Sequence, residues 1–243
     1  DRSPSRGLGD VYKRQEFFGT SVAILVGDLA LVYAEDMFQD SGLSAAALHR
    51  ARSPWRGMRT EVIGGQLLDI SLEAAGSESV ELANSVNRYK TAAYTIERPL
   101  HLGASIAGAS EELIAAFRGY GQDIGIAYQL RDDQLGVFGD PAVTGKPAGD
   151  DLREGKRTEL LALALRRADE SDPQAAATLR KLIGHTSDPQ ELSRLAQIIA
   201  DSGAPEEIER RIASLTQSGL QHLRAARVDP AVTETPVSYT HLR

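Results

Sequence analysis

Residues 128–136 of this 243-residue chain read Tyr128-Gln129-Leu130-Arg131-Asp132-Asp133-Gln134-Leu135-Gly136, within a long pattern of three- and four-residue spacing. At about 100° per residue, Gln129, Asp132, Asp133 and Gly136 share an arc of roughly 100° on one helix face. Two carboxylates about 4 Å apart repel by roughly 4 kcal/mol at an effective dielectric of about 20, which favours a cation in front of them. Mg²⁺ suits such hard oxygen ligands. A lone acidic pair is also typical of a solvated helix face, so the surrounding sequence must decide between a metal site and an ordinary surface.

The helical pattern continues on both sides of this segment. Ala, Leu, Glu and Arg recur at helical spacing, and no sustained alternation of Val, Ile and aromatic residues marks strands. Breaks are expected at turn-forming pairs such as Asp172-Pro173 and Asp188-Pro189. We therefore predict an all-α domain, with helices over residues 17–40, 44–75, 78–97, 99–109, 111–138, 157–169, 172–184, 188–201 and 205–226.

Composition excludes several functional classes. With 34 Asp and Glu against 27 Lys and Arg, the net charge is −7, so we expect no nucleic-acid partner. The absence of cysteine excludes disulfides and thiolate zinc sites, so any metal is expected on carboxylates. The longest apolar run, residues 21–34, is shorter than the roughly 20 residues that a bilayer needs. We expect no transmembrane segment, no signal peptide and a cytoplasmic location.

Both ends differ from the rest of the chain. Residues 1–15 and 236–243 are polar and aperiodic, and the strings GLGDVYKRQ and VSYTHLR resemble translated sequencing-adapter sequence. We expect both tails to be non-native and the natural chain to be cut short, although frayed termini are commonly polar as well. The domain is therefore predicted to cover residues 16–235 as a single, partial unit.

Two earlier predicted helices also carry polar residues in positions that call for an explanation. Lys90 falls on the stripe that also carries Val86 and Tyr94. Because burying an unpaired ammonium is costly, this lysine is expected either to meet an anion or to extend to the rim. On the preceding helix, Gln66 and Asp69 form another polar pair at i and i+3.

A long irregular stretch follows the acidic helix. Residues 139–155 are rich in Gly, Pro, Asp and Lys, and long loops of this kind are often functional. We expect this loop to fold back so that Lys146 and Lys156 lie beside the helix that carries Asp132 and Asp133. We interpret the segment as a lid that carries cations.

In order and spacing, these segments resemble the trans-isoprenyl diphosphate synthases, the polyprenyl synthetase family. The resemblance spans most of residues 17–226, and six landmarks in the right order are far more specific than any one of them. The landmarks are Ala23-Ile24-Leu25-Val26-Gly27-Asp28, Gly65-Gln66-Leu67-Leu68-Asp69, Tyr89-Lys90-Thr91-Ala92, Pro99-Leu100-His101-Leu102-Gly103-Ala104, Tyr128-Gln129-Leu130-Arg131-Asp132-Asp133, and Thr144-Gly145-Lys146 through Asp150 to Lys156.

The resemblance implies an isoprenoid-synthase-type helical bundle around a central cavity, here lacking its N-terminal helices. It implies a prenyltransferase that condenses isopentenyl diphosphate with an allylic diphosphate by Mg²⁺-dependent ionisation, and a homodimer. Carried over by position, Asp132 and Asp133 would bind Mg²⁺, with Asp69 in its outer shell. Lys90, Lys146 and Lys156 would bind diphosphate, and Thr91 and Gln129 would steady the allylic cation.

The chain departs from the family pattern in two ways. Gly136 stands where the D-D-x-x-D motif usually has its third aspartate. The first aspartate-rich motif, the arginine pair after it and the Gly-Gly-Lys segment for isopentenyl diphosphate are absent, so the chain by itself is expected to be inactive. Glu35, Asp36 and Asp40 follow a later landmark and are interpreted as an ordinary acidic helix end.

Two other functions remain open on the residues alone. A non-catalytic partner subunit of a heteromeric prenyl synthase would tend to lose aspartates and lysines, and Gly136 points slightly that way. A terpene cyclase of the same architecture usually carries a second metal motif of Asn, Ser or Thr and Glu, which fits this sequence less well. The length of the product is not predicted, because the residues that set cavity depth precede the resemblance.

Overall fold

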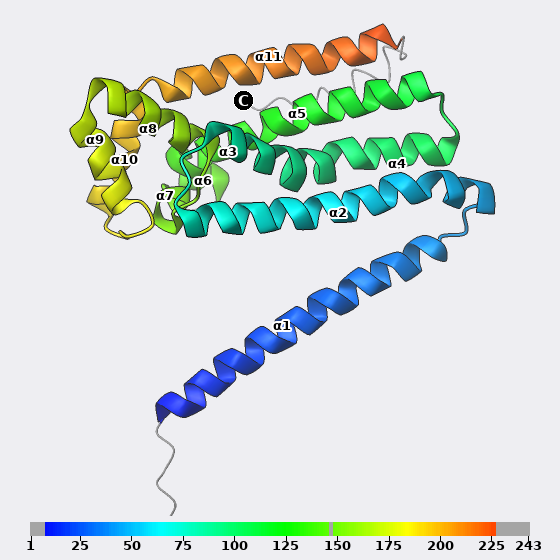
Figure 1. Ribbon diagram of the computed structural model, residues 1–243, viewed down its shortest axis with the longest axis horizontal. Helices are drawn as coiled ribbons and strands as arrows, with labels where there is room; N and C mark the ends of the chain where they lie inside the picture. The colour runs from blue at the N-terminus through cyan, green and yellow to red at the C-terminus, as the bar shows by residue number, and fades with distance from the viewer. Residues whose placement is uncertain (1–7, 146–147, 227–243) are drawn as a thin grey trace, which may run out of the picture. The chain divides into compact units, whose positions relative to one another are not determined.

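The computed structural model describes residues 8–145 and 148–226, and these residues form helices and no β-strand. The all-α prediction is confirmed. The chain divides into two compact units, Asp1–His49 and Arg50–Arg243. The elements are α1 (Leu8–Gln39), α2 (Ala45–Ala75), α3 (Val80–Val86), the π-helix η1 (Asn87–Glu97), α4 (Arg98–Ala107), α5 (Glu111–Phe138), α6 (Pro141–Thr144), α7 (Asp150–Glu154), α8 (Glu159–Ser171), α9 (Pro173–Leu182), α10 (Pro189–Asp201) and α11 (Ala204–Ala225) (Figure 1).

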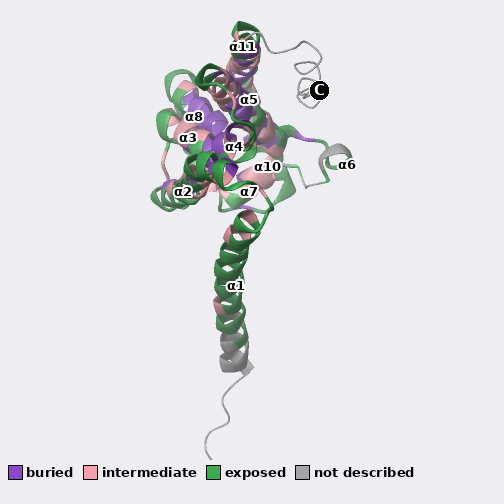
Figure 2. Cartoon of the chain, turned by 90° about the vertical axis from the view of Figure 1, so that its right-hand side faces the viewer, coloured by how far each residue is buried: buried purple, intermediate pink, exposed green. Residues whose placement is uncertain are grey.

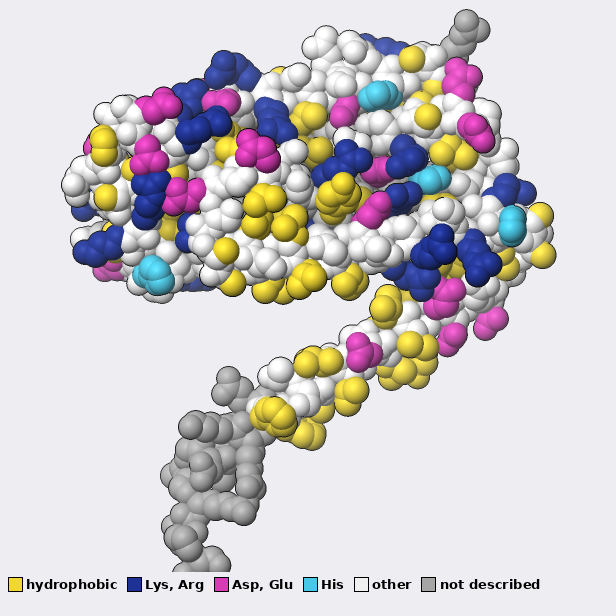
Figure 3. Space-filling view, in the orientation of Figure 1, with side chains coloured by type: hydrophobic (Ala, Val, Ile, Leu, Met, Phe, Trp, Pro, Cys, Tyr) yellow, Lys and Arg dark blue, Asp and Glu magenta, His cyan; other side chains and the backbone are white. Residues whose placement is uncertain are grey.

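The first unit is dominated by α1, which begins at Leu8 rather than at residue 17. Its apolar side chains lie exposed along the helix (Figure 3). By length and composition, Phe17–Gln39 could cross a membrane, with a mean hydropathy of 1.8 and none of the window buried. The apolar helix is thus longer than the sequence predicted and long enough for a bilayer, because Gly27 and Asp28 do not interrupt it. Residues 236–243 lie outside the described residues.

The second unit is built around α5, which packs against η1, α4, α8 and α11. Its buried Ile126, Ala127 and Leu130 belong to one apolar core that also takes side chains from α8, α9, α10 and α11. Figure 2 shows α8 among the most buried parts of the chain. Helix starts follow the expected signals, since Asp172 and Asp188 accept hydrogen bonds from the first backbone N–H groups of α9 and α10.

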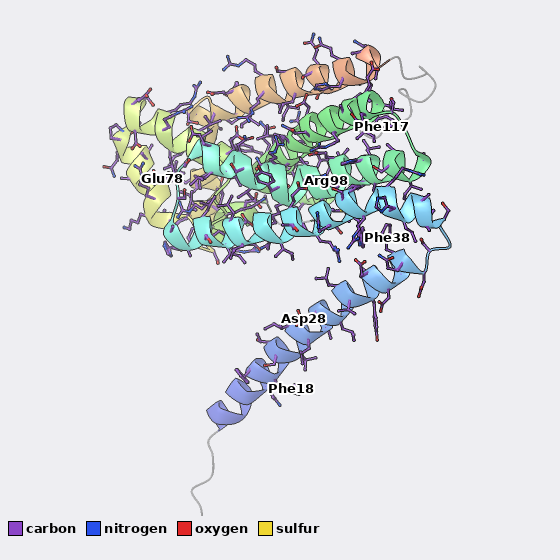
Figure 4. All side chains as sticks on the ribbon, turned by 45° about the vertical axis from the view of Figure 1, so that its right-hand side comes forward. Phe18, Asp28, Phe38, Glu78, Arg98 and Phe117 are labelled. Atoms are coloured by element: carbon purple, nitrogen blue, oxygen red, sulfur yellow. The ribbon has the colours of Figure 1, made fainter. Side chains whose placement is uncertain are left out.

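Glycines allow η1 to lie directly against its neighbours. A Cβ on Gly125 of α5 would fall 2.5 Å from Cβ of Ala92, and a Cβ on Gly65 of α2 would fall 2.8 Å from Cα of Lys90. Two turns after Lys90, Arg98 of α4, labelled in Figure 4, forms an ion pair with Glu61 of α2. These close approaches determine where along their lengths α2, η1 and α5 pack against one another.

The segment predicted as one helix over residues 78–97 changes character at Asn87. Ser79 caps α3, and the helix then widens into η1 and returns to α-geometry at Arg98. Pro99 lies just after the change and has no N–H to donate to the preceding turn, which favours a local rearrangement. Wide π-turns occur frequently at functional sites. Here the widened turn carries Lys90 and Thr91.

The segment predicted as an irregular loop over residues 139–155 contains two short helices, α6 and α7. Asp140 caps α6, and Gly155 ends α7 in the left-handed conformation. Backbone bonds then fasten α7: the N–H of Lys156 donates to the Asp151 carbonyl at 3.0 Å, and the N–H of Gly184 donates to the Leu152 carbonyl at 2.9 Å. Lys146 lies outside the described residues.

Candidate active site

The first part of the site joins η1 to α2. The Lys90 ammonium forms an ion pair with the Asp69 carboxylate, whose side chain is nearly buried, while one third of the Lys90 side chain stays exposed. Lys90 is therefore partly exposed and also meets an anion, so both features expected from the sequence occur together. Asp69, predicted in the outer shell of a metal, holds this lysine in the structure.

The second part joins η1 to α5. The Thr91 hydroxyl donates to Oε1 of Gln129 at 2.7 Å. Nε2 of Gln129 donates to Oδ1 of Asp133 at 2.8 Å and to Oδ2 of Asp132 at 3.4 Å. Because ionised carboxylates only accept, the Gln129 amide must turn its nitrogen to the aspartates and its oxygen to Thr91. The shared helix face predicted for Gln129, Asp132 and Asp133 is therefore present.

The third part brings the end of the α7 segment onto α5. Nζ of Lys156 donates to Oδ1 of Asp133 at 2.8 Å and to Oδ2 of Asp151 at 3.4 Å. Burial raises the pKa of the Asp133 carboxyl, and burial likewise raises the pKa of Asp151 to about 6, with Lys156 opposing both shifts. Burial would lower the pKa of Lys156, but the Asp133 and Asp151 carboxylates outweigh it and hold that pKa above its ordinary value.

One buried oxygen at this site points to a cation. Asp133 is 1% exposed, and its Oδ2 is buried without a hydrogen-bond partner in the described structure. Mg²⁺ typically takes one or two protein carboxylates and fills its shell with water and phosphate oxygens, so the Asp132–Asp133 pair fits that role. Within residues 8–145 and 148–226, no three His, Cys, Asp or Glu side chains converge on one metal position. The chemistry of the site thus fits a metal shared with a phosphate.

Two acidic residues near this site were not assigned from the sequence. Asp151 lies in the segment interpreted as a lid, and its contact with Lys156 depends on how α7 packs, which no local pattern predicts. Glu73 lies on α2, and partial desolvation and the Asp69 carboxylate raise its pKa, while Lys90 and Lys156 oppose the rise. The signal for Glu73 was present, because it follows Asp69 by four residues on the same helix face.

A chain of polar contacts thus runs from Thr91 through Gln129 and Asp133 to Lys156, with the Lys90–Asp69 pair beginning one residue away from Thr91. Of the predicted site residues, the structure brings Thr91, Gln129, Asp132, Asp133 and Lys156 together on α5, η1 and the α7 segment. A cationic and acidic surface of this kind can bind diphosphate through its lysines and a metal through its carboxylates.

Comparison with known proteins decides the family. The polyprenyl synthetase family model matches residues 1–201. The chain belongs to the polyprenyl synthetase family. Its structure is similar to the geranylgeranyl pyrophosphate synthase of Corynebacterium glutamicum in complex with isoprenyl diphosphate and magnesium, with a TM-score of 0.90 and 62% identity over 94% of this chain and 65% of that chain.

Two curated members of the polyprenyl synthetase family show more distant similarity. The geranylfarnesyl diphosphate synthase of Aeropyrum pernix is 39% identical over 62% of this chain and 48% of its own length. The (2E,6E)-farnesyl diphosphate synthase of Mycobacterium bovis is 36% identical over 58% of this chain and 38% of its own length. The chain therefore spans about half or less of the curated relatives that it matches.

The structural match also bears on α1. It covers 94% of this chain, and the remainder is shorter than the 23 residues of Phe17–Gln39. At least part of this apolar helix is therefore matched by the polyprenyl synthetase fold. That match weighs against interpreting Phe17–Gln39 as a membrane span.

Proposed function

We propose that the protein carrying this chain is a trans-prenyltransferase that condenses isopentenyl diphosphate with an allylic diphosphate. The observation that carries the proposal is the continuous set of contacts that joins Thr91, Gln129, Asp133 and Lys156 across three elements. The family match and the ligands named for the Corynebacterium glutamicum synthase support this choice of substrates.

In the proposed reaction, the C1–O bond of the allylic diphosphate breaks and the double bond of isopentenyl diphosphate attacks C1. A proton then leaves the new chain for the departing diphosphate. Lys90 and Lys156 would bind diphosphate oxygens, since each presents an ammonium that is held by a carboxylate yet is not fully buried. Their positive charge would stabilise the charge that develops on the leaving group.

Thr91 and Gln129 would act on the cationic side. Because the Thr91 hydroxyl hydrogen is committed to Gln129, the lone pairs of its oxygen are free to face positive charge. The aspartates hold the Gln129 amide and so fix this arrangement before the substrate binds. Preorganised dipoles of this kind require no reorganisation during the reaction.

Asp132 and Asp133 would hold Mg²⁺, which when bound neutralises diphosphate charge. Without a cation, the two aspartates and the net charge of −7 would repel the substrate. The buried, unpartnered Oδ2 of Asp133 supports this role because an orphaned acceptor is costly unless a partner reaches it.

Calorimetry tests the proposal. We define the repaired protein as a chimaera in which this chain replaces the segment that it matches in the Corynebacterium glutamicum synthase. Pyrophosphate should bind the repaired protein more tightly with Mg²⁺ than with a chelator, and this gain should disappear when Asp132→Asn and Asp133→Asn are combined. Asp123→Asn, on the same helix, serves as the matched control. Equal affinity with and without chelator would refute the metal role.

We further propose that the repaired protein is a homodimer. Ile63, Leu67 and Ile70 form an exposed apolar stripe on α2, on the face opposite the buried Leu72. An apolar stripe on a helix is typical of a surface that packs against another element. Light scattering coupled to size-exclusion chromatography should give twice the mass of one chain, and a monomeric mass would contradict the proposal.

A further inference from the structure

The Asp151 carboxylate occupies the position that a side chain on Gly136 would need. A Cβ on Gly136 would fall 2.7 Å from Oδ1 of Asp151 and still closer to Cγ and Oδ2. Real Cβ atoms do not approach other atoms so closely, so a side chain at position 136 and the Asp151 carboxylate in its present position exclude each other. Gly136 is also the position at which the helix motif usually carries its third aspartate. The carboxylate that α5 lacks is thus replaced in space by one from α7.

The backbone, rather than a loose loop, holds Asp151 in this place. Lys156 N–H donates to the Asp151 carbonyl at 3.0 Å, so the turn at Gly155 closes directly on the residue concerned. Gly155 adopts φ of +77°, and a Cβ on it would fall 3.0 Å from Cα of Gly184. Only glycine fits both requirements. The backbone on either side of Asp151 is therefore held against the turn after α9, through Leu152 and Gly155.

Asp151 and Asp133 together hold one ammonium. Nζ of Lys156 lies 2.8 Å from Oδ1 of Asp133 and 3.4 Å from Oδ2 of Asp151, and three quarters of its side chain is buried. Among the described residues, no hydrogen-bond partner reaches the second, buried oxygen of Asp133. Lys156 therefore has two anionic contacts, and neither uses Oδ2 of Asp133, which stays available for another cation.

We propose that Asp151 supplies from α7 the carboxylate that α5 lacks at Gly136, and that it is a positioning residue which holds the Lys156 ammonium beside Asp133. This inference rests on the proposed function, because its purpose is to place Lys156 for a diphosphate. It also explains why glycine at position 136 is compatible with the site, since a larger residue would push the Asp151 carboxylate away from the lysine.

The labelling rate of Lys156 with acetic anhydride, followed by mass spectrometry on the intact 243-residue chain, tests this role without substrate. Exposed Lys181 gives the internal reference rate. Asp151→Asn removes the charge, and Gly136→Ala displaces the carboxylate without changing the charge. Each should raise the rate for Lys156 about tenfold relative to Lys181, the equivalent of one lost charged hydrogen bond.

Two further variants separate positioning from damage to the fold. Asp150→Asn alters the neighbouring carboxylate, which pairs with Arg153, and should leave the rate for Lys156 unchanged. The double variant Gly136→Asp with Asp151→Ala moves the carboxylate to α5 and should restore slow labelling, whereas Asp151→Ala alone should not. Unchanged rates in Asp151→Asn and Gly136→Ala, or no recovery in the double variant, would overturn the proposal.

Pyrophosphate binding by the repaired protein distinguishes this inference from the proposed function. If the parent gains affinity with Mg²⁺, Asp151→Asn should lose about tenfold and the double variant should recover it. If Asp151→Asn binds pyrophosphate as tightly as the parent, the proposed role of Asp151 is refuted, while the prenyltransferase proposal is unaffected. A parent that gains nothing from Mg²⁺ would refute the proposed function, while the labelling result would still decide how Lys156 is held.

Discussion

Adjacent glycines on α2 should respond in opposite ways to the same substitution. A Cβ on Gly64 would meet nothing within 4 Å, whereas a Cβ on Gly65 would fall 2.8 Å from Cα of Lys90 and 2.9 Å from the carbonyl carbon of Tyr89. Gly64→Ala therefore changes only the helix propensity. Gly65→Ala must instead push α2 and η1 apart, because both contacts are with backbone that cannot rotate away.

The magnitudes follow from these contacts. Alanine in place of an exposed helical glycine stabilises a helix by about 0.5 to 1 kcal/mol, which is the gain expected for Gly64→Ala. Overpacking against rigid backbone costs about 1 to 3 kcal/mol, so Gly65→Ala should be net destabilising by up to about 2.5 kcal/mol after the same gain is subtracted. Because the propensity gain is common to both variants, their free energies of unfolding should differ by the overpacking cost of about 1 to 3 kcal/mol.

Thermal unfolding followed by circular dichroism measures this difference. For a protein of this size, 1 kcal/mol corresponds to about 2 to 4 °C, so the Gly65→Ala midpoint should lie several degrees below that of Gly64→Ala. Gly65→Ala should also weaken pyrophosphate binding by the repaired protein, because the displaced backbone carries Lys90. Equal midpoints, or a Gly65→Ala variant more stable than the parent, would refute the close packing of α2 on η1.

Three further predictions concern pH, catalysis and the chain alone. Glu159 is fully buried and its pKa is raised by burial to about 7, so the native state binds the proton more tightly than the unfolded state and stability falls as pH rises from about 4.5 to about 7. In urea titrations across that window, the free energy of unfolding of Glu159→Gln should exceed that of the parent by up to about 3 kcal/mol. The free energy of unfolding of Glu170→Gln, on the same helix, should equal that of the parent. Thr91→Val should lower kcat of the repaired protein at least about tenfold with little change in KM, and Thr95→Val, exposed on the same π-helix, should not; a change confined to KM would contradict the role of Thr91. The 243-residue chain alone should show no condensation of isopentenyl diphosphate in a radiolabel assay, since it covers only 65% of the Corynebacterium glutamicum synthase and its described residues bring no three ligating side chains onto one metal position. Robust turnover would contradict this prediction and make Glu35, Asp36 and Asp40 candidate metal ligands.

Much of the fold could be predicted from the sequence because helix signals are local. The periodicity over residues 111–138 and the caps at Asp172 and Asp188 predicted the ends of α5, α9 and α10 to within about two residues. The π-helix could not be predicted in this way, since Lys90 and Thr91 have no local pattern that distinguishes it from an α-helix. Its widening depends on the packing of η1 against α5 and α2.

The candidate site was predicted as far as residues share one helix or one motif. Gln129, Asp132 and Asp133 lie on one face of α5, as the spacing indicated. The partners across elements could not be predicted from spacing. Asp69 pairs with Lys90 because α2 and η1 approach closely at Gly65. The Asp151 carboxylate lies against Gly136 because α7 packs on α5.

We propose that Asp132, Asp133 and the lysines form one site for a diphosphate and its metal. A crystal structure of the repaired protein with Mn²⁺ in place of Mg²⁺ and with pyrophosphate tests it most directly, because anomalous scattering locates the metal. We predict a metal about 2.1 Å from a carboxylate oxygen of Asp132 or Asp133, with pyrophosphate bound to Lys90 and Lys156. A metal that touches neither aspartate, or pyrophosphate bound away from both lysines, would contradict the account.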